Sequence, residues 1–203
     1  NLALAYIDYL KFLKNENNNS LPLLQNAQRK ILHLSKRNYF ESDFLLKTFV
    51  SYYHFIAKND SWKNALNKAL EGYNLKDFDQ GNVKKRIDYL FDLGSIYREV
   101  KNPYEAIFFF NKSLELNSKF NGINNITLVD SYNNLGDAYL ECYNPTKSNE
   151  CYKKAISILE KSTTINPKNI DRLLTGYRNF ISNLLEYGAI DDSKKYLNKI
   201  NNL

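Results

Sequence analysis

The stretch 131–160, SYNNLGDAYLECYNPTKSNECYKKAISILE, constrains the fold more than any other part of the chain. Its apolar and aromatic residues fall at helical spacing on either side of an Asn-Pro turn, which predicts two antiparallel helices. Small residues at positions 136 and 148 let the helices approach closely, while the larger ones fill the seam between them. The seam residues are Tyr132, Leu135, Gly136 and Tyr139 in the first helix and Ser148, Tyr152 and Ala155 in the second.

The same arrangement recurs along the chain. Leu90, Leu93, Gly94 and Tyr97 repeat the first-helix spacing. The small residue that opens each second helix recurs at intervals of 38, 41, 42 and 45 residues. Its five positions are Ala27, Ala65, Ala106, Ser148 and Ser193.

The aromatic-x2-L-G-x2-Y spacing resembles the signature of the tetratricopeptide repeat (TPR) family. The resemblance is good over Val83–Leu203 and loose over residues 1–80. The usual TPR period is about 34 residues, so these longer units are similar to those of kinesin light chains and of bacterial regulators, including peptide-pheromone receptors and modules attached to CHAT-type proteases. Two alternatives stay open: chance recurrence among aromatic-rich helices, and a HEAT-like array, whose period is about 40–47 residues.

We therefore expect an all-α fold, a right-handed α-solenoid forming a single domain over residues 1–203. The resemblance implies about five antiparallel pairs. The sequence contains no Met, even at position 1, and we expect it to be a piece of a longer protein. The expected pairs span 1–37, 39–75, 83–119, 125–162 and 167–203.

Composition and motifs argue against catalysis. No run approaches the roughly 18 apolar residues of a membrane helix, and no signal peptide opens the chain. His33 and His54 lie on different expected helices, away from ligand-type spacings, and nucleotide-binding and nucleophile motifs are absent. Cys142 and Cys151 suit reduced thiols in a cytoplasmic protein. We predict no enzyme activity, no metal and no cofactor.

The resemblance implies that the first helix of each pair lines a concave, peptide-binding surface. The chaperone-type carboxylate clamp, a Lys and an Asn on successive turns, is absent from the matching positions. In long-period TPRs, an Asn at the places of Asn134 and Asn179 commonly binds a peptide backbone; a solvated polar residue is the alternative. The concave-face residues expected to bind are Asp88, Phe91, Asp92, Ser95, Arg98, Asp130, Asn133, Asn134, Asp137, Arg178, Asn179 and Ser182. A less surely phased second pair adds Lys47, Ser51, His54 and Lys58, the fourth pair adds Glu141, and the fifth adds Thr175 and Glu186.

These residues predict a protein- or peptide-binding scaffold. The formal net charge of +6 allows a nucleic-acid binder, but the lysines fall mainly on second helices, which argues against one. A sensor module that controls an effector domain elsewhere in the protein is a further alternative. Four aspartates on adjacent first helices predict an acidic groove centre, suited to basic or amide-rich segments, unless local cations pair with them. The sequence indicates no membrane partner and no particular oligomeric state.

Overall fold

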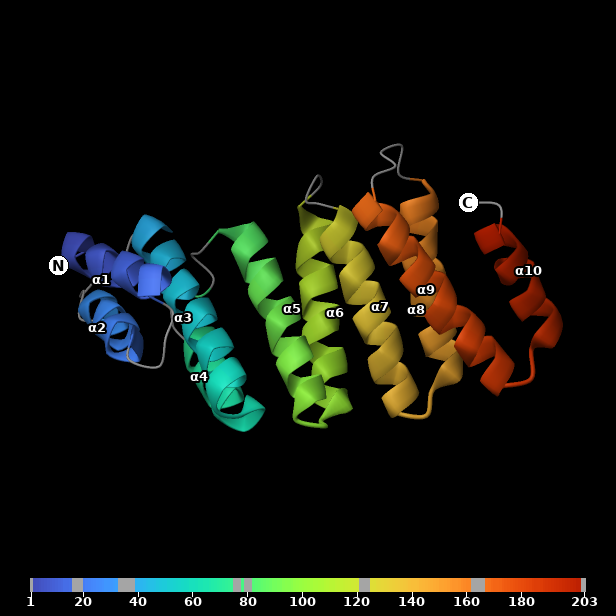
Figure 1. Ribbon diagram of the computed structural model, residues 1–203, viewed down its shortest axis with the longest axis horizontal. Helices are drawn as coiled ribbons and strands as arrows, with labels where there is room; N and C mark the ends of the chain where they lie inside the picture. Colours follow the sequence, from blue (N-terminus) through green and yellow to red (C-terminus); the bar gives the residue numbers. More distant parts are fainter. Residues whose placement is uncertain are drawn as a thin grey trace. The chain divides into compact units, whose positions relative to one another are not determined.

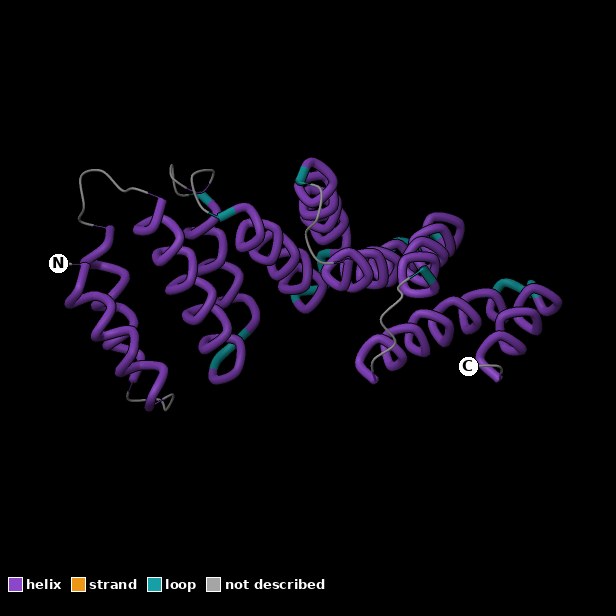
Figure 2. Tube along the Cα trace, turned by 90° about the horizontal axis from the view of Figure 1, so that it is seen from above, coloured by secondary structure: helices purple, strands orange, loops and turns teal. Residues whose placement is uncertain are grey.

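The computed structural model describes residues 2–15, 20–32, 39–74, 78, 82–120, 125–161 and 167–201, and these residues form helices without any strand (Figure 2). The all-α prediction is therefore confirmed. His33, the loops at 16–19, 33–38 and 121–124, and most of the 77–82 linker lie outside the described residues. The helices are α1 (Leu2–Asn15), α2 (Leu21–Leu32), α3 (Tyr39–Asn59), α4 (Trp62–Tyr73), α5 (Val83–Glu99), α6 (Pro103–Lys119), α7 (Asn125–Glu141), α8 (Pro145–Glu160), α9 (Pro167–Glu186) and α10 (Ile190–Asn201) (Figure 1).

The helices divide between two compact units. Unit 1, residues 1–100, contains α1 to α5, and unit 2, residues 101–203, contains α6 to α10. Consecutive helices pack as pairs inside each unit: α1 with α2 and α3 with α4 in unit 1, α7 with α8 and α9 with α10 in unit 2. The prediction of a single domain concerns how the two units sit together, and it stays a prediction.

Local sequence explains the sharp turns between paired helices. In unit 2 the Asn144 side chain caps α8, because its Oδ1 accepts a hydrogen bond from the Lys147 amide at 3.1 Å, and Pro145 follows at the first helical position. Helix α7 ends in a left-handed residue, Tyr143 (φ 56°), and the Asn144 amide donates to the Tyr139 carbonyl at 2.8 Å. Gly188 (φ 75°) occupies the same place between α9 and α10.

The recurring small residue is buried in every pair, but its place in the first pair differs from the prediction. It is the fourth residue of α4, α6, α8 and α10. In α2 the fourth residue is Leu24, whereas Ala27 is the seventh, and both are fully buried. A leucine therefore takes this position in the first pair. The four small residues are Ala65, Ala106, Ser148 and Ser193.

The seam predicted between α7 and α8 is present. Tyr152 is 1% exposed, and its ring lies against Gly136, where an added Cβ would come 2.6 Å from a ring carbon. The Tyr152 hydroxyl passes the seam and donates to Asp137 Oδ1 at 2.6 Å. On its other side, α8 packs on Tyr177 and Phe180 of α9, so α8 joins two first helices into one core.

The α5 signature in unit 1 is buried in the same manner, with Leu90, Leu93 and Gly94 facing the core. Tyr89 donates through its hydroxyl to the Ala69 carbonyl of α4 at 2.8 Å. In the described part of the chain, no helix is both long and apolar enough to cross a membrane.

Candidate functional site

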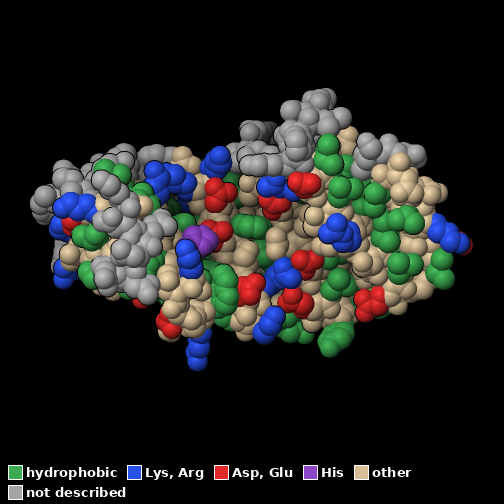
Figure 3. Space-filling model, in the orientation of Figure 1, with side chains coloured by type: hydrophobic (Ala, Val, Ile, Leu, Met, Phe, Trp, Pro, Cys, Tyr) green, Lys and Arg blue, Asp and Glu red, His purple; other side chains and the backbone are tan. Residues whose placement is uncertain are grey.

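First helices lie beside one another in each unit, α3 next to α5 in unit 1 and α7 next to α9 in unit 2. Figure 1 shows α7 and α9 in front, with α8 behind them. Figure 3 shows acidic and basic groups interspersed on this face, with hydrophobic side chains between them. Each pair of first helices holds a pocket.

The pocket of unit 2 lies between α7 and α9 and has a volume of about 530 Å³. Every side chain that lines it is polar: three carboxylates, three amides, one guanidinium and one hydroxyl. Such a surface can exchange hydrogen bonds with a peptide backbone at many points. The lining residues are Asp130, Asn133, Asn134, Asp137, Asp171, Arg172, Thr175 and Asn179.

Two contacts between α7 and α9 mark this pocket. Two guanidinium nitrogens of Arg172 donate to the Asp130 carboxylate, Nε to Oδ1 at 3.0 Å and Nη2 to Oδ2 at 3.4 Å. Asn179 donates from Nδ2 to Asp137 Oδ1 at 3.4 Å, the oxygen that also accepts from Tyr152. Asp130 and Asp137 are two helical turns apart, about 10 Å. The carboxylates are thus fixed before any ligand arrives.

The amides of α7 lie between these two contacts. Asn134 donates from Nδ2 to the Asp130 carbonyl of its own helix at 2.9 Å. Asn133 Oδ1 is buried and has no hydrogen-bond partner among the described residues. It faces α9 at Gly176, where an added Cβ would lie 3.6 Å from that oxygen. The structure therefore brings both Asn134 and Asn179 to the pocket, with their amide nitrogens already engaged.

The unit 2 pocket is acidic, as the sequence suggested for the groove centre. Three aspartates against one arginine give its lining a formal charge of −2. Asp130 is compensated by Arg172, an ion pair in which both side chains are about one-third exposed. Asp137 and Asp171 carry the remaining negative charge of the lining.

Unit 1 holds a smaller pocket of about 200 Å³ against α1, α3 and α5. Its two aspartates are balanced by two lysines, so this part of the expected acidic centre is neutral. Asp92 accepts from the Tyr53 hydroxyl at 2.5 Å and lies 3.6 Å from His54 Nε2. Burial, together with the nearby charge of Asp92, raises the pKa of Asp88. The lining residues are Tyr9, Leu46, Lys47, Val50, Ser51, Lys85, Asp88 and Asp92.

Some predicted groove residues line neither pocket. Phe91, Ser95 and Arg98 are half-buried on α5, and Ser95 Oγ donates to the Phe91 carbonyl at 3.2 Å. Arg178 and Ser182 are exposed on α9. Their role in binding stays a prediction.

Asp171 and Arg172 were not among the predicted residues. They precede Thr175 by four and three positions, so they continue its helical face by one turn. Extending that face toward the start of α9 at Pro167 would have found both residues.

No cluster of three or more His, Cys, Asp or Glu side chains suited to a metal ion occurs in the described ranges. Both cysteines are free thiols, and burial raises the pKa of Cys151 to about 11.

Tandem helix pairs with polar first-helix faces define a helical-repeat scaffold. Residues 87–161 match the family model described as tetratricopeptide repeat. The matched stretch includes the signature at Tyr132–Tyr139 on which the resemblance to this family rests. No curated protein sequence matches the chain.

Solved structures share the fold at low identity. BtubC (BKLC) from P. vanneervenii superposes with a TM-score of 0.78 at 15% identity, over 98% of this chain and 77% of that one. A putative kinesin light chain of Podosopora anserina with nearly identical TPR-like repeats gives 0.71 at 11%, over 98% and 92%. MamA gives 0.68 at 16%, over 98% and 88%. These likenesses support the TPR-like fold and do not identify a ligand.

Proposed function

We propose that the chain is a non-catalytic scaffold that holds an extended protein segment between α7 and α9. The observation that carries the proposal is the α7–α9 pocket, which is lined by polar residues only and in which Arg172 holds the Asp130 carboxylate while Tyr152 and Asn179 hold that of Asp137. A preorganised surface of this kind leaves most of the ordering cost to the ligand. The distance of about 10 Å from Asp130 to Asp137 matches roughly three residues of extended chain.

The charge of the pocket selects the ligand class. A lining charge of −2 favours segments that carry Lys or Arg, and the three amides favour side chains and backbones that both donate and accept hydrogen bonds. The same charge repels nucleic-acid phosphates.

We also propose a cytoplasmic location, which rests on the reduced thiols expected from the sequence. A regulatory module attached to an effector domain remains the alternative reading of the same scaffold.

The test uses two six-residue peptides that differ in a Lys-Gln-Lys or a Glu-Gln-Glu centre. We expect the chain to bind the lysine peptide and not the glutamate peptide. Asp137→Asn with Asp171→Asn should weaken binding by about three- to thirtyfold, since each partly exposed charge contact is worth about 0.3–1 kcal/mol. Asparagine at 137 can still accept from Tyr152, so the fold is retained. Fluorescence anisotropy measures the Kd.

The control is Asp191→Asn with Asp192→Asn, which makes the same charge change at exposed positions on α10 outside the pocket. It should leave the Kd within about twofold. A preference for the glutamate peptide, or equal weakening by both double variants, would refute the proposed groove. The stronger reversal Asp137→Lys with Asp171→Lys should abolish binding, and binding that survives it would place the site outside the α7–α9 pocket.

A further inference from the structure

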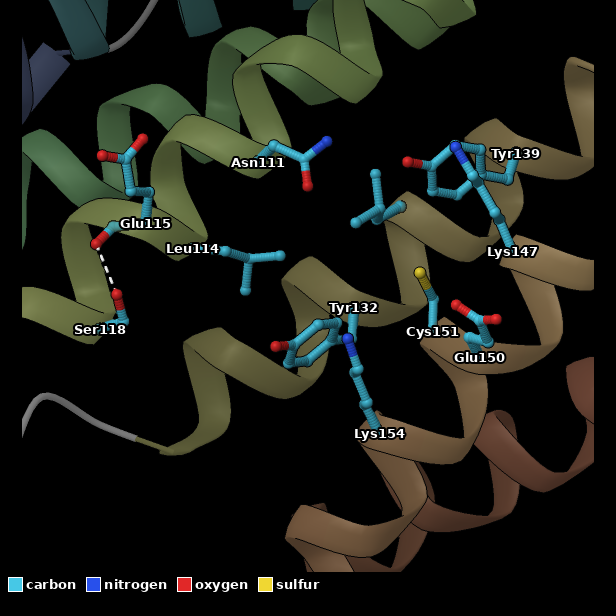
Figure 4. A pocket seen from close by; sticks show the side chains of 11 residues that line it. Asn111, Leu114, Glu115, Ser118, Tyr132, Tyr139, Lys147, Glu150, Cys151 and Lys154 are labelled. Carbon is cyan, nitrogen blue, oxygen red and sulfur yellow. Dashed lines mark hydrogen bonds between the residues drawn. The ribbon is translucent and has the colours of Figure 1, made fainter.

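Helix α7 has a second polar-rimmed hollow on the side away from the α7–α9 pocket. It lies between α6 and α8, has α7 as its floor, and has a volume of about 400 Å³ (Figure 4). Unit 2 therefore offers two separate surfaces, one on each face of α7. We call this second hollow the outer pocket. Its lining residues are Asn111, Leu114, Glu115, Ser118, Tyr132, Leu135, Tyr139, Lys147, Glu150, Cys151 and Lys154.

The centre of the outer pocket is apolar. Leu114 points into it from α6 and the Cys151 thiol points into it from α8 (Figure 4), and Leu135 of α7 also lines it. Burial raises the pKa of Cys151 to about 11, so the thiol is neutral at physiological pH. A surface of two leucines and a neutral thiol favours an aliphatic or aromatic side chain over a charged one.

Two matching lysine–tyrosine pairs flank this centre. Lys154 Nζ lies 5.4 Å from the Tyr132 ring centroid, and Lys147 Nζ lies 5.4 Å from the Tyr139 centroid. The tyrosines are seven residues apart on α7 and the lysines seven apart on α8, so the two ammonium groups are held about two helical turns, or 10 Å, apart. The rings restrain the lysines without cancelling their charge.

Neither lysine forms an ion pair with any residue that the structure describes. On the opposite rim Glu115 is bound by Lys119 at 2.7 Å, which lowers its pKa through that hydrogen bond and charge. Glu150 alone remains to oppose the two lysines on this rim. The lining of the outer pocket is formally neutral, with two lysines against two glutamates, and Lys119 beside Glu115 brings the local formal charge to +1, whereas the α7–α9 pocket carries −2.

We propose that the outer pocket is a second docking site, which takes an acidic helical segment of a partner protein. One apolar side chain of that segment enters between Leu114, Leu135 and Cys151, and carboxylates on either side of it, seven residues apart, meet Lys147 and Lys154. A helix fits because the rims are themselves two helices, and because positions i and i+7 of a helix match the lysine spacing. This proposal does not depend on the proposed function of the α7–α9 pocket.

The test uses a helical peptide with Glu at positions i and i+7 and Leu at i+3. We compare it with a peptide that has Lys in place of both Glu, one that has Ser in place of Leu, and one with a central Pro that prevents the helix. We expect the Glu-Leu-Glu peptide to bind, and each change to weaken it at least about tenfold. Fluorescence anisotropy gives the Kd. A chain that carries Cys142→Ser allows a second readout, protection of Cys151 from alkylation by the bound peptide.

The protein variant is Lys147→Glu with Lys154→Glu, for which we expect at least tenfold weaker binding. Its matched control is Lys161→Glu with Lys195→Glu, which changes the net charge equally at exposed positions outside the pocket and should change the Kd less than twofold. Circular dichroism confirms that both variants stay folded.

The docking site would be overturned if the Glu-Leu-Glu peptide showed no saturable binding at millimolar concentration, or if it bound without protecting Cys151. It would also be overturned if the Lys147/Lys154 and Lys161/Lys195 double variants weakened binding equally, or if the serine peptide bound as well as the leucine peptide. The last would reveal a basic patch for any polyanion rather than a site for an anchored helix. Equal binding of the Pro peptide would refute the helical ligand.

Discussion

Two glycines of unit 2 allow a matched test of the seam, because the same substitution meets different surroundings. A Cβ added at Gly136 in α7 would lie 2.6, 2.9 and 3.0 Å from three ring atoms of Tyr152. A Cβ added at Gly176 in α9 would meet only ordinary contacts, 3.4 Å from Ile156 and 3.6 Å from Asn133. Both glycines are buried within helices, so Gly→Ala at each isolates the close helix approach.

Helix propensity favours both changes equally, by about 1 kcal/mol. At Gly136 this gain is opposed by overpacking, which costs about 1–3 kcal/mol in a filled core. The Tyr152 ring cannot easily move aside, because it is 1% exposed and its hydroxyl is bound to Asp137. We therefore expect Gly176→Ala to stabilise by about 0.5–1 kcal/mol and Gly136→Ala to destabilise by about 0–2 kcal/mol. Gly136→Leu should cost more than alanine.

Urea unfolding followed by circular dichroism gives the two free energies, provided that the m-values agree. Combining Gly136→Ala with Tyr152→Val should cost less than the sum of the single changes, because the smaller side chain makes room for the new methyl group. If Gly136→Ala is as stable as Gly176→Ala, the two helices do not approach closely at residue 136, and the seam as described is wrong.

Two further predictions concern a turn and an ion pair. Tyr143→Gly should stabilise the protein by about 0.5–1 kcal/mol and raise the Tm, because a non-glycine residue in the left-handed conformation costs about 1–2 kcal/mol and the 90% exposed Tyr143 side chain contributes little packing. Part of the gain is lost, because glycine has more conformational freedom in the unfolded chain. A lower Tm would contradict this prediction. Burial opposes ionisation of Glu160, but the hydrogen bonds from Lys199 and Tyr177 and the charge of Lys199 outweigh burial and lower the pKa of Glu160. The contribution of Glu160 to stability is therefore present above about pH 4.5 and is lost as the pH falls through its folded-state pKa. The stability difference between the wild type and Glu160→Gln should therefore shrink on acidification, and a pH-independent difference would refute this pairing.

The sequence was sufficient to predict the helix pairs because their seams depend on residue size at fixed spacing. A glycine at 136 beside an aromatic at 152 has few structural explanations other than a close crossing. In the first pair the register differs, because Ala27 is the seventh residue of α2 and Leu24 the fourth, although both are fully buried. A large residue there gives no recognisable signal, so the sequence pattern selected the nearest small residue, Ala27.

The binding surface was only partly predictable, because helical phase identifies a face but not the partner of each charge. Asp130, Asp137 and Asn179 were expected on the concave face and line the α7–α9 pocket, and their role in binding stays a prediction. The pairing of Asp130 with Arg172 depends on where α9 begins and on how α7 and α9 align. Both are set by tertiary packing and cannot be read from the neighbouring residues in the sequence. The outer pocket was missed because its lysines belong to a second helix, where charge usually indicates solvent exposure.

The hydroxyl of Tyr152 links the packing of unit 2 to its groove. A phenylalanine ring has the same shape and would fill the seam equally well. Tyrosine adds a hydroxyl that reaches Asp137 from the side of the core, and the same oxygen of Asp137 accepts from Asn179. If the α7–α9 pocket binds a ligand as proposed, a carboxylate that Tyr152 already holds loses little freedom on binding, so the residue that closes the seam would also lower the entropic cost of that binding. On this argument, the stability of the α7–α8 pair and the affinity of the α7–α9 pocket should change together when Tyr152 is replaced.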